Sequence, residues 1–516
     1  MLIMAIKPGH DGSIAAVEDG RLLWCLESEK DTFPRRVALT PTTVLAAAEG
    51  LGRIPDVVAL GGWEKPRIGG AIGAGYEGVD TVQRSTVRFF GKDVELFSSS
   101  HERSHLMMAL GMAPHNDSDL TAVLVWEGVS GVFHLVDREW RVVRTIPVLS
   151  APGERYAFLF SLADPTFPDR GRTARQDGSG KLMALASYGN PDDADADIIA
   201  AIDRLLKIDD LNPAPKGDFA DTVLYNAGVE SEATKTAAAL LSRRLFETFA
   251  AAALHEIPAG LPLRISGGCG LNCDWNAAWR DLDHFSDVFV PPCTNDSGSA
   301  IGTAIDALAH HGSIQPLDWD VYSGLEFVYD CVPDASRWQP VPRNDTELAA
   351  AIASGRVVSW VQGRWEIGPR ALGNRSLLAE PYSTATRDRL NWIKQREDYR
   401  PIAPICREED LADAFVESFP DPYMLYFRRV RSPRLGAVTH VDGSARAQSV
   451  TQASNPSVYS LLSAFAEETG MGVLCNTSLN LNGQGFVNRM SDLIRYSEAR
   501  GIDDMVVGDV WYRRSR

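Results

Sequence analysis

Several features are scarce in this sequence, and each absence narrows the class of protein. No apolar run approaches the ~20 residues that span a membrane, so a membrane protein is not expected. Residues 1–7 are apolar except for Lys7, but Pro8 and Gly9 follow too soon for a signal peptide. The seven cysteines are odd in number, and Cys269 and Cys273 have a CxxxC spacing that fits neither a disulfide framework nor a zinc ribbon. We therefore expect a cytoplasmic protein with reduced thiols.

Basic residues are also fewer than acidic residues over the chain as a whole. The sequence has 51 Lys and Arg against 68 Asp and Glu, a formal net charge of −17. A surface of this sign repels polyanions, so nucleic acid is not an expected partner unless a local basic pocket overrides the repulsion. The 516 residues are too many for one core. We predict two domains, 1–330 and 331–516, with a linker near residues 312–344.

The pattern of apolar segments and turns predicts an α/β fold in which one motif occurs twice. Two three-stranded meanders are expected, at 1–7, 14–17 and 22–26, and at 119–126, 132–136 and 140–146. Helices are expected over 41–51, 234–256 and 273–282, and further strands from 57, 263 and 288. Thr40 is placed to cap the first helix, and Pro41 suits its first turn.

His101 and His105 are the most informative pair of residues. Four positions apart on a helix, their imidazoles project from one face and can hold one metal ion. Asp296, where an apolar strand runs into a helix start, is the best candidate for a third ligand. The pair by itself is as well explained by two ordinary core or surface histidines.

Four glycine-rich turns point to nucleotide phosphates, because glycine lets backbone N–H groups approach oxygen closely. Each turn alone is equally consistent with a plain turn. The segment 177–181 contains a lysine but lacks the spacing of a Walker A loop. The predicted nucleotide-binding residues are Gly128, Ser130, Gly131, Gly180, Lys181, Gly267, Gly268, Asn272 and Asn295.

The segment 356–407 has a net positive charge, opposite in sign to that of the whole chain. It has ten basic side chains, nine of them arginine, against five carboxylates. A charge run is usually a solvated helix face. Here glycine, proline and apolar residues interleave with the arginines, as in 363–375, which indicates a structured pocket. Guanidinium groups suit bidentate binding of phosphate.

With these motifs in view, the first part of the chain resembles the first domain of the O-carbamoyltransferases of antibiotic and nodulation-factor biosynthesis. The resemblance is carried by residues 9–13, His101, His105, 180–189, 267–272 and 295–296. It implies an actin-like ATPase fold of two lobes, similar to the tRNA threonylcarbamoyl-transfer protein TsaD, with a metal, commonly iron, beside the nucleotide phosphates. The implied metal ligands are His101, His105, Asp296 and Glu127.

The second part resembles the YrdC-like domain of the same family, through the segments 368–376 and 476–480. The resemblance implies an α/β domain that makes carbamoyl adenylate from ATP and carbamoyl phosphate. The residues implied to bind carbamoyl phosphate are Arg370, Lys394, Arg400, Arg446, Asn476 and Ser478, and Arg370 and Lys394 are also expected to be catalytic.

The chemistry explains why two sites are needed. A carbamate carbonyl is a poor acyl donor, and linkage to AMP supplies a leaving group. Arginines would stabilise the charge that develops on phosphate. A metal would then polarise the carbamoyl oxygen while His10, or less favourably Asp11, accepts the proton of an alcohol. As an alternative, His10 merely closes the first phosphate turn.

The expected acceptor is the hydroxyl of a small natural product. The segments 7–11 and 98–105 look most similar to the branch that acts on hydroxymethyl cephems, although macrolide-modifying relatives share such features. The expected cofactors are ATP with Mg²⁺ and a divalent metal, with iron favoured and zinc or manganese also compatible. Two other functions remain open, a tRNA threonylcarbamoyl-type modification enzyme and a non-catalytic nucleotide-binding regulator. The sequence carries no signal for an oligomeric state.

Overall fold

The structure is a computed structural model that describes residues 1–31, 33–64 and 72–515. The chain packs as two compact units. Unit 1 comprises 1–115, 291–439 and 443–516, and unit 2 comprises 116–290 and 440–442. Each unit contains mixed sheets covered by helices, which confirms the α/β class. A domain boundary at residue 330 stays a prediction, since unit 1 contains segments from both sides of it.

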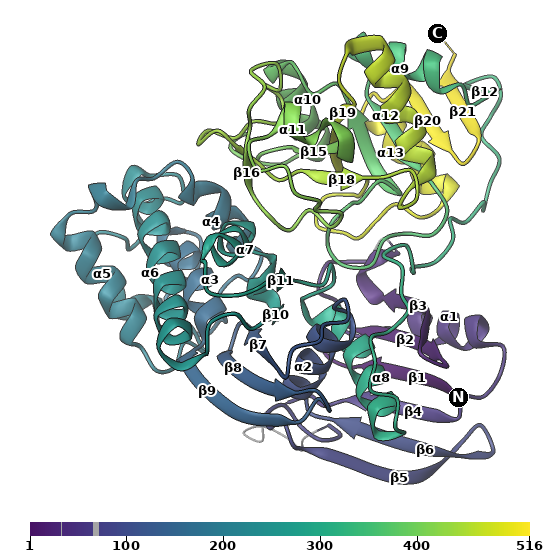
Figure 1. Ribbon diagram of the computed structural model, residues 1–516. Helices are drawn as coiled ribbons and strands as arrows, with labels where there is room; N and C mark the ends of the chain where they lie inside the picture. Colours follow the sequence, from purple (N-terminus) through teal and green to yellow (C-terminus); the bar gives the residue numbers. More distant parts are fainter. Residues whose placement is uncertain (32, 65–71, 516) are drawn as a thin grey trace. The chain divides into compact units, whose positions relative to one another are not determined.

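Unit 1 begins with a six-stranded sheet of order β3-β2-β1-β4-β6-β5 (Figure 1). The strands are β1 (Leu2–Lys7), β2 (Ser13–Glu18), β3 (Arg21–Glu27), β4 (Val57–Gly61), β5 (Val82–Phe89) and β6 (Lys92–Ser99), with helices α1 (Pro41–Leu51), α2 (His101–Gly111) and α8 (Ser299–His310). The first predicted meander is confirmed as β1, β2 and β3, which pair antiparallel. Thr40 caps α1 as predicted, because its hydroxyl accepts the Thr43 N–H at 3.1 Å.

Unit 2 repeats this strand pattern in a five-stranded sheet of order β11-β10-β7-β8-β9. Its strands are β7 (Leu120–Trp126), β8 (Ser130–Asp137), β9 (Val142–Ser150), β10 (Leu263–Ser266) and β11 (Val288–Phe289), and its helices are α3 (Pro152–Ala163), α4 (Gly178–Ala186), α5 (Ala196–Lys207), α6 (Glu232–Glu256) and α7 (Cys273–Asp281). In both sheets an antiparallel meander is followed by strands parallel to its first strand. The second predicted meander is therefore confirmed.

The carboxyl-terminal part of unit 1 is built on an eight-stranded mixed sheet, order β12-β21-β20-β13-β14-β19-β15-β18. Its strands are β12 (Trp338–Pro342), β13 (Val358–Val361), β14 (Arg375–Ala379), β15 (Ala403–Arg407), β18 (Gln448–Val450), β19 (Val473–Ser478), β20 (Asp504–Val507) and β21 (Val510–Arg514), beside the short pair β16 (Arg428–Arg429) and β17 (Ser444–Ala445). The helices are α9 (Asp345–Ala353), α10 (Thr384–Lys394), α11 (Leu411–Ala414), α12 (Pro456–Thr469) and α13 (Met490–Ala499). Apolar clusters lie on both faces of this sheet.

The structure adds a strand to one expected irregular segment and contradicts another. Part of the expected linker forms the edge strand β12, which pairs antiparallel with β21 over five residues. The segment 177–181, expected to be a glycine-rich turn, contains the start of α4. Gly178 is needed there because a Cβ on it would lie 2.7 Å from the Phe160 ring. Tertiary packing, and not a phosphate turn, accounts for this glycine.

Candidate functional site

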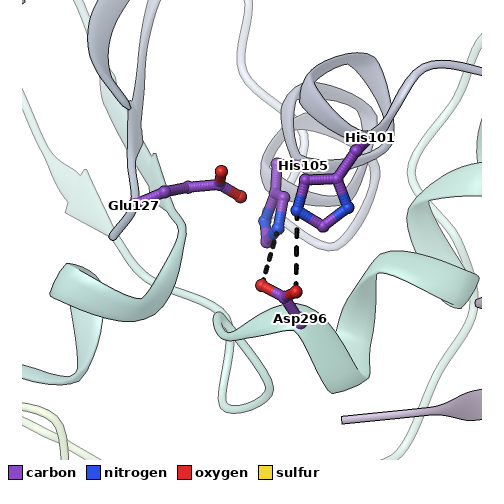
Figure 2. Close-up of side chains that lie close together, drawn as sticks. All are labelled: His101, His105, Glu127 and Asp296. Carbon is purple, nitrogen blue, oxygen red and sulfur yellow. Dashed lines mark ion pairs between the residues drawn. The ribbon is translucent and has the colours of Figure 1, made fainter. Parts of the chain in front are cut away.

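The two histidines and Asp296 meet as the sequence predicted. His101 opens α2, whose first turn is capped by Ser100 through a 3.1 Å bond from Arg103 N–H. Both imidazoles lie on one face of α2 and point toward Asp296 (Figure 2). Nε2 of His101 lies 3.6 Å from Oδ2 of Asp296, and Nε2 of His105 lies 3.5 Å from Oδ1. Each carboxylate oxygen therefore faces one imidazole, and the two histidines are at most 1% exposed.

The packing of α2 against α8 fixes the distance between the two histidines and Asp296. A Cβ on Gly302 would lie 1.8 Å from the carbonyl oxygen of Ser104, so only glycine permits this close approach. Arg103 donates two bonds of 2.7 Å to the carboxylate of Asp306, which is fully buried. The Ser104 and Thr303 hydroxyls lie 2.9 Å apart. Packing and a bidentate ion pair thus hold the helix of the histidines against the helix that follows Asp296.

Two further basic groups lie against the Asp296 carboxylate. Lys7, the last residue of β1, is fully buried, and its Nζ lies 3.1 Å from Oδ2 of Asp296. His10 Nδ1 lies 3.6 Å from the same oxygen and 2.8 Å from Oδ2 of Asp11. Burial by itself would raise the pKa of Asp296, but Lys7 and the imidazoles outweigh it and hold this pKa well below its usual range. The Asp296 carboxylate is therefore an anion with basic groups on several sides.

Sequence reasoning missed Lys7. A lysine at a strand end is normally assigned to the surface. The one available signal was that Lys7 is the sole charged residue among the first seven positions. Its ammonium also lies 3.9 Å from the centre of the Trp63 ring, a favourable site for a buried cation.

The donor set fits a divalent transition metal. Imidazole nitrogen and carboxylate oxygen suit iron, zinc and manganese. Atoms bound to one ion at ~2.1 Å in tetrahedral geometry lie about 3.4 Å apart, close to the 3.5 and 3.6 Å between the imidazoles and Asp296. Glu127 lies in unit 2 directly after β7, and its assignment as a ligand stays a prediction.

The glycine turns of unit 2 lie at one edge of its sheet, because β7 and β10 are parallel neighbours and both end there. Gly267 has a φ of +106°, and a Cβ on it would lie 2.3 Å from the carbonyl oxygen of Trp126. Asn272 caps α7, accepting the N–H groups of Asp274 and Trp275. Gly267 and Asn272 therefore already have structural roles, and nucleotide binding at this edge stays a prediction.

The other predicted nucleotide-binding residues are spread over several elements. Gly128 precedes β8, Ser130 and Gly131 begin β8, Gly180 and Lys181 lie in the first turn of α4, and Gly268 opens a 3₁₀ turn before α7. Asn295 belongs to unit 1, next to Asp296.

The second predicted site gathers around Lys394 at the end of α10. Its Nζ donates to both oxygens of Ser478 and to both oxygens of Asn480. Asn476 of β19 donates to Ala371 O at 3.0 Å, which brings the strand against the loop of Arg370. The structure therefore places Ser478 against Lys394, and Asn476 against the residue next to Arg370. Arg370, Arg400 and Arg446 are half-buried.

Like charges crowd this second site. Burial lowers the pKa of Lys394 well below its usual range, and four arginines lower it further: Arg396, Arg35, Arg400 and Arg500. Burial, with Arg400 and Arg446, also lowers the pKa of Arg396 to about 9. Arg396, Arg35 and Arg500 were not predicted as site residues. A sequence count detects the surplus of arginine but not which of them converge.

The loop of Arg370 is held from beneath by Glu366. One oxygen of this fully buried carboxylate accepts the N–H groups of Leu372, Asn374 and Arg375, at 2.5, 3.3 and 3.4 Å. The buried Arg375 guanidinium donates to Gln362 O, Gly363 O and Asn488 Oδ1. Because these groups bond to each other, the loop is ordered independently of any substrate.

Comparison with known proteins agrees with this two-part organisation. A family model described as the carbamoyltransferase N-terminus matches residues 79–305, and one described as the carbamoyltransferase C-terminus matches 349–514. A 3'-hydroxymethylcephem-O-carbamoyltransferase from Streptomyces clavuligerus is 63% identical over 100% of this chain and 99% of its own. One from Amycolatopsis lactamdurans is 63% identical over 100% of both chains.

These matches define an enzyme that transfers carbamoyl groups to oxygen. The chain belongs to the carbamoyltransferase family, among its antibiotic O-carbamoyltransferases. A solved activator of the 2-hydroxyisocaproyl-CoA dehydratase from Clostridium difficile is 12% identical and covers 60% of this chain and 97% of its own, with a TM-score of 0.36, too low to carry an argument. The actin-like and YrdC-like assignments stay predictions. No helix in the described part of the chain is long and apolar enough to cross a membrane.

Proposed function

We propose that this enzyme transfers a carbamoyl group to the 3'-hydroxymethyl group of a cephem, with carbamoyl phosphate and ATP as co-substrates. One observation carries the choice of acceptor: two relatives that bear this activity in their names are each 63% identical to the chain over its whole length. Two observations support a reaction in two stages. The cations around Lys394 form a site that suits anions, and the carboxylate of Asp296 forms a site that suits a cation.

The first stage belongs to the cationic site around Lys394. Carbamoyl phosphate is hydrolysed there by one water molecule to phosphate and carbamate, and a carbamate oxygen attacks the α-phosphorus of ATP. A P–O bond to carbamate forms, the bond to the β-phosphate oxygen breaks, and pyrophosphate leaves. Arg370, Arg400 and Arg446 neutralise the phosphates, and Lys394 is held by Ser478 and Asn480 for the same task. Asn476 keeps the Arg370 loop in place.

The second stage belongs to the Asp296 site. His10 Nδ1 is held by Asp11 at 2.8 Å, which favours the tautomer that leaves Nε2 free to accept a proton. The His10 side chain is 41% exposed, so an alcohol can reach it. His10 takes the hydroxyl proton while the alcohol oxygen attacks the carbamoyl carbon, and AMP leaves.

A divalent ion, most simply Fe²⁺, fits the donors His101, His105 and Asp296. When bound there it supplies Lewis acidity toward the carbamoyl oxygen. Glu127 is kept as a further candidate ligand from the family resemblance. In the same proposal, the glycine-rich edge of the unit 2 sheet, together with Gly180 and Lys181, holds the nucleotide through N–H groups and the lysine charge. Asn295 of unit 1 is kept as a candidate nucleotide-binding residue from the family resemblance.

Mass spectrometry tests the proposal directly. The purified protein is incubated with ATP and carbamoyl phosphate, first alone and then with a 3'-hydroxymethyl cephem. The matched control acceptor is the same cephem with a 3'-methyl group, which lacks the hydroxyl. Pyrophosphate and AMP that depend on carbamoyl phosphate are expected, with a carbamoylated product only from the hydroxymethyl compound. If a product forms without pyrophosphate release, the adenylate route is wrong. If a macrolide alcohol reacts in preference, the acceptor is wrong.

A further inference from the structure

A buried ion pair that neither stage uses lies between the loop of Arg370 and the loop of Asp296. Glu27, at the end of β3, and Lys30, in the next turn, are 3% and 2% exposed. Oε2 of Glu27 lies 3.2 Å from Nζ of Lys30. Removing two charges from water costs several kcal/mol per ion and is a poor way to gain stability. A gain in stability therefore does not explain this buried ion pair, but its contacts indicate a functional role.

The Glu27 carboxylate bonds to both loops at once. Its Oε1 accepts the Gly368 N–H at 2.6 Å and the Ser297 hydroxyl at 3.3 Å. Gly368 lies two residues before Arg370, and Ser297 directly follows Asp296. One oxygen atom therefore joins the backbone that carries the proposed carbamoyl-phosphate ligand to the residue beside the proposed metal ligand.

Lys30 extends the connection to the surroundings of Lys394. Its Nζ donates to the carbonyl of Gly368 and lies 4.0 Å from the centre of the Phe486 ring. Phe486 belongs to the segment that folds back on Asn480, whose amide donates to Gln484 O at 2.9 Å. Asn480 in turn accepts from Lys394. The pair thus contacts segments from both sites.

The glycine at the junction permits a close fit. Gly368 has a φ of +85°, and a Cβ on it would lie 2.2 Å from the carbonyl oxygen of Pro292. The Arg370 loop is therefore packed directly on the segment that leads into Asp296, and Glu27 fastens this contact.

We propose that Glu27, with Lys30 as its counter-ion, is a positioning residue that holds the Arg370 and Asp296 loops in one fixed arrangement. In that arrangement each adenylate that forms is used for transfer of its carbamoyl group. This inference rests on the proposed two-stage function. Without the bridge, each loop keeps its own internal contacts and its own chemistry, but the adenylate is no longer delivered in the geometry for transfer and is lost to water. A misplacement of ~1 Å costs about 100-fold in rate.

Two variants separate positioning from simple stability. Glu27→Gln keeps an oxygen that faces the Gly368 N–H and the Ser297 hydroxyl, but leaves the Lys30 charge buried and unpaired. It should melt at a lower temperature and still release about one pyrophosphate per carbamoylated product, since the bridge persists. The double variant Glu27→Leu/Lys30→Met replaces the pair by apolar groups. The Gly368 N–H loses its acceptor but no unpaired charge remains, so this variant should melt no lower than Glu27→Gln. The pyrophosphate-to-product ratio should nevertheless rise several-fold and transfer should fall by about 100-fold.

A matched control is available in the same unit. Arg407 and Asp410 are also three residues apart, and Asp410 also accepts a glycine N–H, that of Gly472 at 3.0 Å. Within the described part of the chain, their hydrogen bonds and ion pairs go to neither of the two loops, so Arg407→Met/Asp410→Leu should leave the ratio unchanged. A folded Glu27→Leu/Lys30→Met protein with the wild-type ratio would overturn the inference, as would a raised ratio in folded Glu27→Gln. Absence of pyrophosphate release in the wild type would instead refute the proposed function.

Discussion

The two candidate sites of unit 1 are electrostatic opposites. At the first, a single carboxylate, Asp296, lies among basic groups, and its pKa is held well below its usual range despite burial. At the second, a single ammonium, Lys394, lies among further cations and neutral oxygens, and its pKa is driven well below its usual range. The basic groups at Asp296 are Lys7, His10, His101 and His105.

The difference in charge matches the ligands that the proposed function assigns to each site. The imidazoles beside Asp296 offer ring nitrogens, which are ligands of transition metals, and the Asp296 carboxylate is an anion that suits a cation. The cations around Lys394 repel one another, and an incoming phosphate or pyrophosphate would relieve that repulsion. Damage to one site should therefore leave the chemistry of the other site intact.

The largest expected effect is loss of transfer in His101→Ala. Losing an outer-shell partner of a metal already costs 10- to 100-fold, so losing a ligand should reduce product formation by more than about 100-fold. Pyrophosphate release should stay near the wild-type rate, because Lys394 and its arginines are untouched. His134→Ala is the control, since this buried histidine contacts Thr145 within unit 2. Equal loss of both stages in His101→Ala would contradict the contrast.

Lys394→Met should produce the converse defect. Removing a preorganised charge from a developing phosphate anion costs about 100-fold or more. Pyrophosphate release should fall by this amount, while metal content, measured by plasma emission spectroscopy, should not change. Arg387→Met on the same helix is a suitable control, because Arg387 pairs with Asp388 at the surface. A Lys394→Met protein that still makes adenylate at the wild-type rate would remove Lys394 from the chemistry.

The histidine pair of the first site was predictable from a local sequence pattern, whereas the individual residues of the second site were implied by the family resemblance. The i, i+4 spacing of His101 and His105 requires only that a helix form there. The repeated meanders were predictable because apolar segments alternate with turn residues. Lys7, Arg35 and Arg500 were not, because their role arises from tertiary packing that brings distant segments against one charge. A hydrophobic or charge pattern along the chain contains no record of such convergence.

A smaller effect concerns pH. Burial and nearby guanidinium groups disfavour the charged form of Lys394, so its pKa is lowered and the ammonium is lost at a lower pH than for an ordinary lysine. In the proposed first stage the Lys394 ammonium binds carbamoyl phosphate, so the affinity for carbamoyl phosphate should fall as pH rises through this pKa, by at most about ten-fold per pH unit. The Michaelis constant for carbamoyl phosphate against pH provides the measurement. Lys394→Arg should flatten the profile, since a guanidinium keeps its charge; an unchanged profile would show that another group titrates.

The smallest expected effect comes from the ion pair that holds α2 against α8 beside the Asp296 site. Arg103 and Asp306 join α2 to α8 through a bidentate ion pair that does not include Asp296. Asp306→Asn removes the charge but keeps the size, so the helices stay packed at Gly302 while their register loosens. Metal affinity of the apoprotein, titrated with Co²⁺ and followed by visible absorption, should weaken by about ten-fold, as for other outer-shell groups.

Asp287→Asn breaks a comparable ion pair with Arg264 in unit 2 and should leave Co²⁺ affinity unchanged. The Lys394 site should also be unaffected by Asp306→Asn, so pyrophosphate release remains a readout of intact folding. If Co²⁺ binds Asp306→Asn as tightly as the wild type, the glycine crossing alone sets the spacing of the imidazoles. In that case Gly302→Ala, which forces a methyl group against the Ser104 carbonyl, becomes the change that must weaken binding.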